Sequence, residues 1–374
     1  MPRLSQVEVY EIRVQALTPI HVGMNERLTG VDYIHHGGWL YVVDHDKLFQ
    51  ELEKNRLVNM YLRELESGHF SLTLFLRNNG VDVQRFAEKV ARYRIRFRDH
   101  LRDDSFSSEL MPFIRTLEGS VYLPGSSLKG SLRTSLIYGI LKSNSGLAGK
   151  LLEEIKQERK GKGAVVESVL RRDTHSFESD LLRLLRPSDL FPEAEVETCV
   201  ARLLSMRFGG SGQRRLGFVE VVPSGTVFRG GLHVFMVQKV SEKVARKDMV
   251  GTLVSDLVKM ANERSRAVLQ RDLVRLGGGN VSGSVRRRLD SLLDEVSKVG
   301  ELEAVTSLGY GQGYWKTTVT MAFENLEGQV FRALGSRRFS QAAPRSFPSS
   351  MRLVQEGADG EPSPLGWVKL SFRR

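Results

Sequence analysis

The sequence predicts an α+β protein in which antiparallel sheets carry helices on one face. Three observations support this fold class. A strand-like alternation opens the chain, helical patterns occupy about 46–105, 242–273 and 284–298, and further strands lie between and after them. Strands and helices do not alternate one by one along the chain, so a doubly wound parallel sheet is not expected.

The first predicted element is a strand at residues 7–16. Its apolar residues Ile12, Val14 and Ala16 share one side, and polar residues occupy the other, as in a half-buried strand. A Gly-Gly pair at 37–38 then separates two β-rich runs, which is a strong signal for a hairpin.

Helical patterning begins just after this hairpin, and we expect a mostly helical insertion over about 46–118. Leu128, Leu132 and Leu136 then recur every four residues. This spacing predicts a helix over 128–141 whose apolar stripe faces the core.

The rest of the chain alternates between polar, β-rich and helical runs. Residues 143–180 are polar and predict a mobile connection. Later strands are expected at 199–208, 216–222, 226–239, 317–320 and 366–372. Because 374 residues exceed one ordinary core, we expect two units, residues 1–185 with the insertion and residues 186–374.

Charge and composition limit the classes of partner. The chain has 55 Lys and Arg against 44 Asp and Glu, a net charge of +11, which favours nucleic acid or, less simply, an anionic membrane surface. No apolar run approaches the ~18 residues of a membrane span, and no secretion signal opens the chain. The single cysteine, Cys199, excludes intrachain disulfides and fits a reducing cytoplasm. We therefore expect a cytoplasmic protein with no membrane partner.

The segment YLPGSSLKGSLRTSL at 122–136 joins a strand-like end to a predicted helix. A serine is placed to cap this helix, and the free amides of its first turn attract an anion. Two cations four residues apart, and glycines that let a backbone approach, add to the site. The candidate contacts are Gly125, Ser126, Ser127, Lys129, Gly130 and Arg133. The alternative is a serine that only caps, with solvated cations.

This segment is not a nucleotide-binding P-loop. That motif requires Lys directly after its second glycine and Ser or Thr next to the Lys, whereas Lys129 precedes Gly130 here. A phosphate of a nucleic-acid backbone is the better ligand.

A second glycine loop, GYGQGYWK at 309–316, precedes the predicted strand at 317–320. The dinucleotide fingerprint leads into a helix, so the loop fails that test. Its glycines would let an RNA backbone lie against the chain, and Tyr310, Tyr314 or Trp315 would stack on bases. The candidate contacts are Gly309, Gly311, Gln312, Gly313 and Lys316. The alternative is a tight turn with its aromatic rings packed inside.

Other basic glycine loops lie at 160–163, 209–215 and 276–288. Each by itself is more typical of a solvated loop than of a binding site. Several on one basic chain favour a long polyanion over a compact ligand. Arg214 and Arg215 are the candidate contacts among them.

Catalytic signals are weak. His21 follows the first strand, where a histidine acts as a general acid or base in RNA cleavage, contacts a phosphate or is structural. Asp32 offers a metal-binding carboxylate without an acidic partner at ligand spacing. His35 and His36 are adjacent in a hairpin and point to opposite faces, which argues against zinc. We expect no catalytic residue, no metal and no cofactor.

Several motifs resemble the RAMP superfamily of CRISPR-associated proteins, and within it the family of the fifth subunit of the type III-A (Csm) effector complex. They span nearly the whole chain in the expected order, and the LPGSSLKG run is the most specific of them. The motifs are TPIHVG at 18–23, DYI and GGWLYVVDHDKLF in the hairpin region, LPGSSLKG at 123–130, VEVVPSGTVF at 219–228, the glycine loop at 309–313 and PLGWV at 364–368.

The resemblance implies two ferredoxin-like (RRM-like) domains in tandem, the second irregular. It also implies a structural subunit that covers the 3′ part of the crRNA and supports crRNA maturation without a nuclease site of its own. The implied partners are crRNA, target RNA, other Csm subunits (especially the repeating backbone RAMP subunit and the small subunit) and host nucleases. The alternative is a RAMP endoribonuclease that uses Asp32 or His21.

Overall fold

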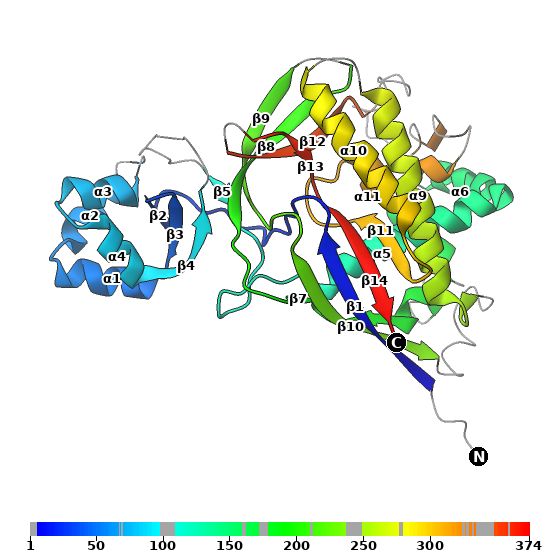
Figure 1. Cartoon of the computed structure of the whole chain (residues 1–374), viewed down its shortest axis with the longest axis horizontal. Coiled ribbons are helices and arrows are strands. Elements are labelled where there is room, and N and C mark those ends of the chain that lie inside the picture. The colour runs from blue at the N-terminus through cyan, green and yellow to red at the C-terminus, as the bar shows by residue number, and fades with distance from the viewer. Residues whose placement is uncertain are drawn as a thin grey trace.

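The fold is mixed α+β, as the sequence predicts, with two sheets and helices around them (Figure 1). The computed structural model describes residues 6–66, 68, 70–97, 109–158, 162–171, 179–209, 212–236, 249–276, 280–323, 326, 329–330, 333, 348–357 and 360–374. Within these ranges, no helix is long and apolar enough to cross a membrane.

The first sheet brings the two ends of the chain together. Its strands follow the order β11-β14-β1-β10-β6, with β7 on β10, and the pairings are antiparallel. The predicted alternation at 7–16 is confirmed, because Ile12, Val14 and Ala16 are buried. The strands are β1 (Gln6–Ala16), β6 (Leu185–Pro187), β7 (Phe191–Pro192), β10 (Val227–Met236), β11 (Glu303–Ser307) and β14 (Trp367–Arg373).

The second sheet has the order β13-β12-β8-β4-β3-β2, with β9 on β8 and β5 on β9. The hairpin predicted around residues 37–38 is confirmed: β2 and β3 are antiparallel, and both glycines have positive φ. The strands are β2 (Tyr33–His36), β3 (Trp39–Val43), β4 (Ala91–Arg96), β5 (Leu110–Met111), β8 (Cys199–Arg207), β9 (Gln213–Val221), β12 (Ser350–Glu356) and β13 (Ser363–Pro364).

Helices cover both faces of part of the first sheet, whereas the sequence predicted one covered face. Ala304 and Val305 are neighbours on β11, and their side chains enter different cores. Ala304 packs in the core of α5, and Val305 packs with Trp367 in the core of α9 and α10. The helices are α1 (His45–Lys54), α2 (Val58–Leu65), α3 (Leu72–Asn78), α4 (Val83–Val90), α5 (Gly125–Ser143), α6 (Ser145–Gln157), α7 (Lys162–Glu167), α9 (Leu253–Arg275), α10 (Asn280–Lys298) and α11 (Tyr314–Thr317), with 3-10 turns η1 (Ser168–Leu170), η3 (Leu181–Leu184) and η5 (Thr320–Ala322).

The helix predicted at 128–141 is confirmed as α5, but its capping differs from the prediction. Pro124 is the N-cap residue, and no side chain caps the helix. Instead, the amide of Gly125 donates to Asp189 Oδ1 at 2.8 Å. A carboxylate from a distant segment therefore satisfies an amide that a local serine was expected to satisfy.

Three further local predictions differ from the structure, and one strand is missing from the prediction. The strand predicted at 317–320 is the end of α11 followed by η5, because Trp315 and Lys316 are drawn into the interior. Part of the connection predicted at 143–180 is helical, as α6 and α7. The predicted helical insertion ends at Val90, where β4 begins, and β12 was not anticipated. At 317–320 burial outweighs the local strand propensity, whereas α6 follows a local pattern, with an Asn144 cap and buried Ala148, Leu151, Leu152 and Ile155 at helical spacing.

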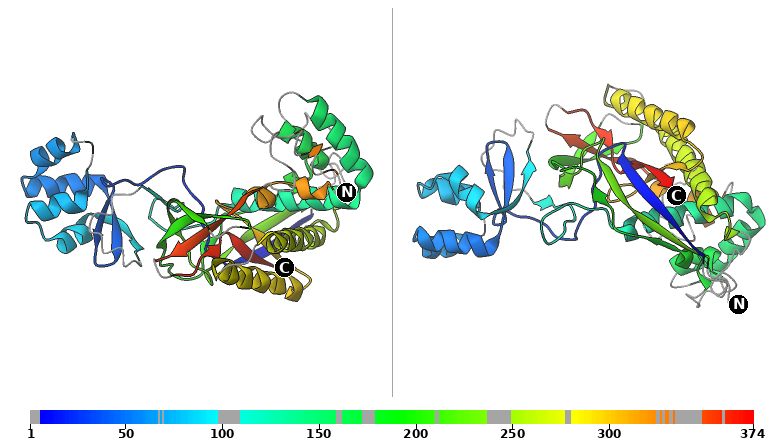
Figure 2. Two further views of the ribbon diagram at one scale, coloured as in Figure 1. Left: turned by 90° about the horizontal axis from the view of Figure 1, so that it is seen from above. Right: turned by 60° about the horizontal axis from the view of Figure 1, so that its bottom comes forward.

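The helices α1–α4 and the strands β2–β4 form a lobe beside the rest of the molecule (Figures 1 and 2). The lobe has its own core, which includes Leu48, Phe75 and Phe86. The predicted division of the chain at residue 185 stays a prediction. Each sheet contains strands from both sides of that position.

Candidate nucleic-acid interface

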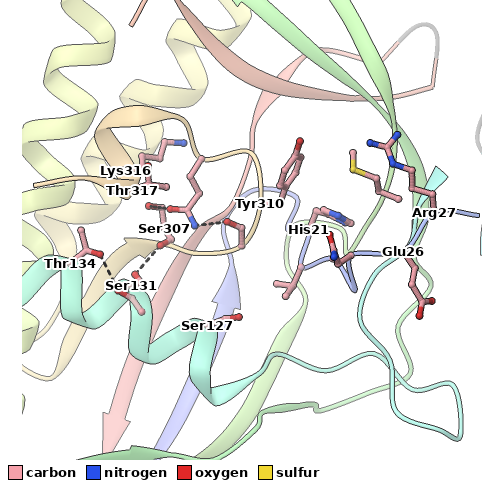
Figure 3. Close-up of a pocket in the computed structure, with 17 residues that line it drawn as sticks. His21, Glu26, Arg27, Ser127, Ser131, Thr134, Ser307, Tyr310, Lys316 and Thr317 are labelled. Atoms are coloured by element: carbon pink, nitrogen blue, oxygen red, sulfur yellow. Dashed lines mark hydrogen bonds between the residues drawn. The ribbon is translucent and has the colours of Figure 1, made fainter. Parts of the chain in front are cut away.

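A cavity of about 660 Å³ lies where three of the sequence motifs meet (Figure 3). It is formed by the turn after β1, the start of α5 and the glycine loop between β11 and α11. The lining residues are His21, Val22, Gly23, Asn25, Glu26, Arg27, Met111, Ser127, Gly130, Ser131, Thr134, Ser307, Gly309, Tyr310, Gln312, Lys316 and Thr317. Segments far apart in sequence thus share one concave surface.

One face of α5 forms a wall of this cavity. Ser127, Gly130, Ser131 and Thr134 are three or four residues apart, so they share one side of the helix. Gly130 is exposed, and a Cβ added to it would meet no atom within 4 Å. The wall is therefore open, small and rich in hydroxyl groups.

Ser131 joins α5 to the end of β11. Its hydroxyl donates to the carbonyl oxygen of Ser307 at 2.8 Å and lies 2.8 Å from the hydroxyl of Thr306. The Ser307 hydroxyl donates to Gln312 Oε1 at 2.9 Å, and the amide of the Gln312 side chain donates to the Gly309 carbonyl at 2.8 Å. This chain of hydrogen bonds holds the glycine loop against the helix.

The turn after β1 holds the same loop from the other side. The backbone amide of Tyr310 donates to the carbonyl oxygen of His21 at 2.7 Å. Gly309 has φ of 86°, and a Cβ there would collide with that carbonyl oxygen. Both the conformation and the close approach require glycine at this position.

His21 is 1% exposed, and its Nδ1 lies 2.7 Å from the backbone carbonyl oxygen of Glu220. A carbonyl oxygen only accepts hydrogen bonds, so Nδ1 carries the hydrogen and Nε2 carries a lone pair. Burial lowers the pKa of the imidazole, which favours this neutral form. The ring meets Tyr310 edge to face, with 5.7 Å between centroids.

A buried ion pair supports the strand that anchors His21. The Glu220 carboxylate is fully buried and pairs with Arg115. It also accepts from the Thr198 hydroxyl at 2.6 Å and from the Phe113 amide at 2.8 Å. With these partners the buried charge is satisfied, and the position of β9 under His21 is defined.

Two basic side chains, Arg27 and Lys316, line the cavity. Arg27 is exposed and pairs with Glu109 at 2.5 Å. Lys316 is buried over the ring of Trp367, and burial lowers its pKa to about 8. Tyr310 is 44% exposed, whereas Trp315 is buried. Among the aromatic residues proposed to stack on bases, Tyr310 thus presents the most accessible ring.

The structure places the other predicted contacts away from the lining. On α5, Lys129 donates to the Leu185 carbonyl at 2.9 Å, and Arg133 pairs with Glu167 at 3.1 Å. Gly125 packs tightly against the backbone at residues 187–188. Arg214 and Arg215 are exposed on β9. Outside the lining too are Ser126, Gly311 and Gly313.

Some lining residues were not anticipated. Ser131 and Thr134 follow Ser127 at helical spacing, so extending that pattern along α5 would have found them. Ser307 carries no local signal, because it lies at the end of β11, far from α5 in sequence. Arg27 lies in the turn six residues after His21 and lines the same cavity.

The residues considered for catalysis or metal binding do not form one site. Asp32 accepts from the amide and the hydroxyl of Thr29 at 2.8 and 2.9 Å and lies 3.2 Å from His45 Nε2, outside the lining of the cavity. His35 is buried against Phe97. Across the described ranges, no three His, Cys, Asp or Glu side chains are grouped to hold a metal ion.

The profile of the RAMP superfamily matches residues 13–312, and the chain therefore belongs to this superfamily. Curated relatives are named CRISPR system Cms protein Csm5. The relative from Enterococcus italicus is 28% identical over 149 residues, and that from Streptococcus thermophilus is 26% identical over 134 residues. These matches cover 34% of this chain in both cases, and 43% and 38% of the relatives' own lengths. The relative from Methanocaldococcus jannaschii is 21% identical over 395 residues, with 97% of this chain and 88% of the relative covered.

Solved structures share the fold. One chain of a cryo-EM structure of a Csm–crRNA–target RNA ternary complex of a type III-A CRISPR-Cas system matches with a TM-score of 0.69 and 21% identity. That match covers 97% of this chain and 100% of the other. The crystal structure of T. onnurineus Csm5 matches with a TM-score of 0.64 and 18% identity, over 95% of this chain and 99% of the other.

Proposed function

We propose that this chain is a crRNA-binding structural subunit of a type III-A (Csm) effector. In this role it caps the 3′ part of the crRNA and supports crRNA maturation in the cytoplasm. The proposal includes two ferredoxin-like units in tandem. It is supported by the relatives named Csm5 and by the similarity to a chain of a Csm–crRNA–target RNA complex.

The observation that carries the proposal is the meeting of three motifs at one cavity. The cavity offers a hydroxyl-bearing helix face, an open glycine backbone and an exposed aromatic ring. Hydroxyl and backbone groups suit phosphate and sugar, while an aromatic ring stacks on any base. Binding should therefore be nearly indifferent to sequence.

The net charge of +11 adds a long-range attraction to RNA. Affinity should fall steeply as the salt concentration rises, because phosphate contacts release counterions. The proposed partners are crRNA, target RNA, the repeating backbone RAMP subunit, the small subunit and host nucleases.

The sharpest test changes the charge of the cavity wall without disturbing the fold. Gly130→Glu introduces a carboxylate at an exposed helical position where an added Cβ meets nothing within 4 Å. Gly149→Glu makes the same change on α6, where a Cβ also has open space. With labelled single-stranded RNA, fluorescence anisotropy should show about tenfold weaker binding for Gly130→Glu, equal to about 1.4 kcal/mol. Gly149→Glu should stay within about twofold of wild type.

Equal affinities for wild type and Gly130→Glu would contradict the assignment of this cavity. The same two variants test the assembled effector. With Gly130→Glu, purified complexes should lose crRNA 3′ sequence on sequencing of the bound RNA, whereas Gly149→Glu should keep it. Unchanged 3′ ends in both would argue against the capping role.

The alternative function is an endoribonuclease, and the free Nε2 of His21 at the cavity is the observation that favours it. We propose instead that the chain does not cleave RNA. Incubation of purified protein with crRNA precursor and with target RNA, with and without magnesium, separates the two functions. Cleavage that disappears in His21→Ala or Asp32→Ala would establish the nuclease.

A further inference from the structure

We propose that His21 distinguishes ribose from deoxyribose, by accepting a hydrogen bond at Nε2 from a 2′-hydroxyl of the bound strand. This inference rests on the proposed RNA-binding function and names the chemical group that the cavity recognises. His21 Nε2 is a hydrogen-bond acceptor, whereas most other polar side chains that line the cavity carry hydroxyl groups or N–H donors (Figure 3).

The protonation state of His21 follows from its anchor. The Glu220 carbonyl oxygen, 2.7 Å from Nδ1, has no hydrogen to give, so the imidazole hydrogen resides on Nδ1. Nε2 is then an acceptor for as long as the ring is neutral. Burial of the ring opposes a second proton, since it disfavours the charged form.

The His21 ring is 1% exposed, and it lines the cavity. Among the described residues, none forms a hydrogen bond with Nε2. A Cβ added at Gly23 would lie 3.0 Å from Nε2. Glycine at this position therefore keeps the approach to the nitrogen open.

The chemistry of an RNA strand then selects the partner. A neutral acceptor disfavours the anionic oxygens of a phosphate, which have no hydrogen to donate. On the sugar–phosphate backbone, the 2′-hydroxyl is the donor, and it is the group that DNA lacks. The imidazole, held in one tautomer, thus recognises the sugar and does not discriminate between bases.

Tyr310 helps to place the sugar. Its ring meets His21 edge to face at 87° and is 44% exposed. A base stacked on this ring would bring its own ribose close to the imidazole. The hydrogen bond from the Tyr310 backbone amide to the His21 carbonyl oxygen holds the two residues, and so their rings, next to each other.

The test compares three single strands of one sequence: RNA, RNA with 2′-fluoro sugars, and DNA with deoxyuridine. A 2′-fluoro group keeps an RNA-like sugar pucker and cannot donate. By fluorescence anisotropy, wild type should bind RNA about threefold to tenfold more tightly than the 2′-fluoro strand, as expected for one neutral hydrogen bond.

Two variants isolate Nε2 from the structural role of the ring. In His21→Asn the side-chain NH₂ still donates to Glu220, but no acceptor remains at the position of Nε2. The preference for RNA over the 2′-fluoro strand should fall to about one. His21→Gln carries an amide oxygen near that position, so it should retain part of the preference.

An equal preference in wild type and His21→Asn would overturn the proposal, as would a preference that changes with base sequence and not with the sugar. Failure of the proposed function has a different signature, namely no salt-dependent RNA binding by wild type and no effect of Gly130→Glu. Thermal unfolding of each variant verifies that the fold is kept.

Discussion

The backbone amide of Tyr310 donates to the carbonyl oxygen of His21 at 2.7 Å. This hydrogen bond joins the turn after the first strand to a loop near the other end of the chain. It closes the cavity between them, and α5 forms the third side. The geometry of the candidate site thus depends on packing between distant segments.

Gly309 should be the least replaceable glycine of the loop. Gly309→Ala forces a side chain into φ of 86° and against the His21 carbonyl oxygen, so both strain and collision oppose folding. We expect a loss of about 2–4 kcal/mol in the free energy of unfolding. Gly313→Ala is the control: its φ is 78° and its ψ is −179°, with nothing within 4 Å of the added Cβ, so backbone strain alone should cost about 1–3 kcal/mol, less than at Gly309. Denaturant unfolding measures both, and equal losses would contradict the close approach.

Glu220→Gln should destabilise the protein strongly. The substitution leaves Arg115 buried at 10% side-chain exposure without its counter-charge, which typically costs about 3–5 kcal/mol. Glu109→Gln breaks an exposed ion pair with Arg27 and should cost at most about 1 kcal/mol. Chemical denaturation of both variants compares them. Similar small losses would mean that the buried pair contributes little.

Removing the ring of Tyr310 should weaken RNA binding without unfolding the chain. The ring is 44% exposed at the cavity, and stacking on a base is worth about 1–3 kcal/mol. Tyr310→Ala should therefore lower RNA affinity by about fivefold or more, whereas Tyr310→Phe should retain it. Anisotropy titrations at one salt concentration make the comparison, and equal affinity for Ala and Phe would exclude stacking.

The two sides of α5 should differ in their effect on RNA. Gly130 faces the cavity, whereas Lys129 donates to the Leu185 carbonyl and lies outside the lining. We expect Gly130→Glu to weaken RNA binding more than Lys129→Glu. A larger loss of RNA affinity for Lys129→Glu than for Gly130→Glu would instead support direct binding of RNA by Lys129 and Arg133.

Asp272 should give the stability a pH dependence. Burial raises the pKa of its carboxyl group from 3.8 to about 6, so the folded state holds a proton that the unfolded state releases. This contribution to stability is present below about pH 4 and is lost as the pH rises to about 6. Asp272→Asn has no carboxyl group to ionise and therefore lacks this loss, so the stability of the variant relative to wild type should increase as the pH rises from about 4 to about 6.

Denaturant unfolding at several pH values measures this difference. Asp290 is exposed on α10, and Asp290→Asn should follow the wild-type profile as a control. Parallel profiles for Asp272→Asn and wild type would contradict the assignment.

Local patterns predicted much of the fold. The alternation of β1, the Gly-Gly hairpin and the leucine stripe of α5 each depend on neighbouring residues, and all three are confirmed. The strand predicted at 317–320 was wrong, because burial of Trp315 and Lys316 outweighs the β-branched run that follows them.

The strands and helices with a clear residue period, the basic charge and the glycine-containing motifs at 18–23, 123–130 and 309–313 are readable along the chain, because neighbouring residues encode each of them. Folding places Gly130 rather than Lys129 at the cavity, and it brings the backbone carbonyl oxygen of Glu220 to His21. Those outcomes depend on which side of a helix is buried and which strands pair. Such choices are made between residues far apart in sequence, where local spacing carries no information.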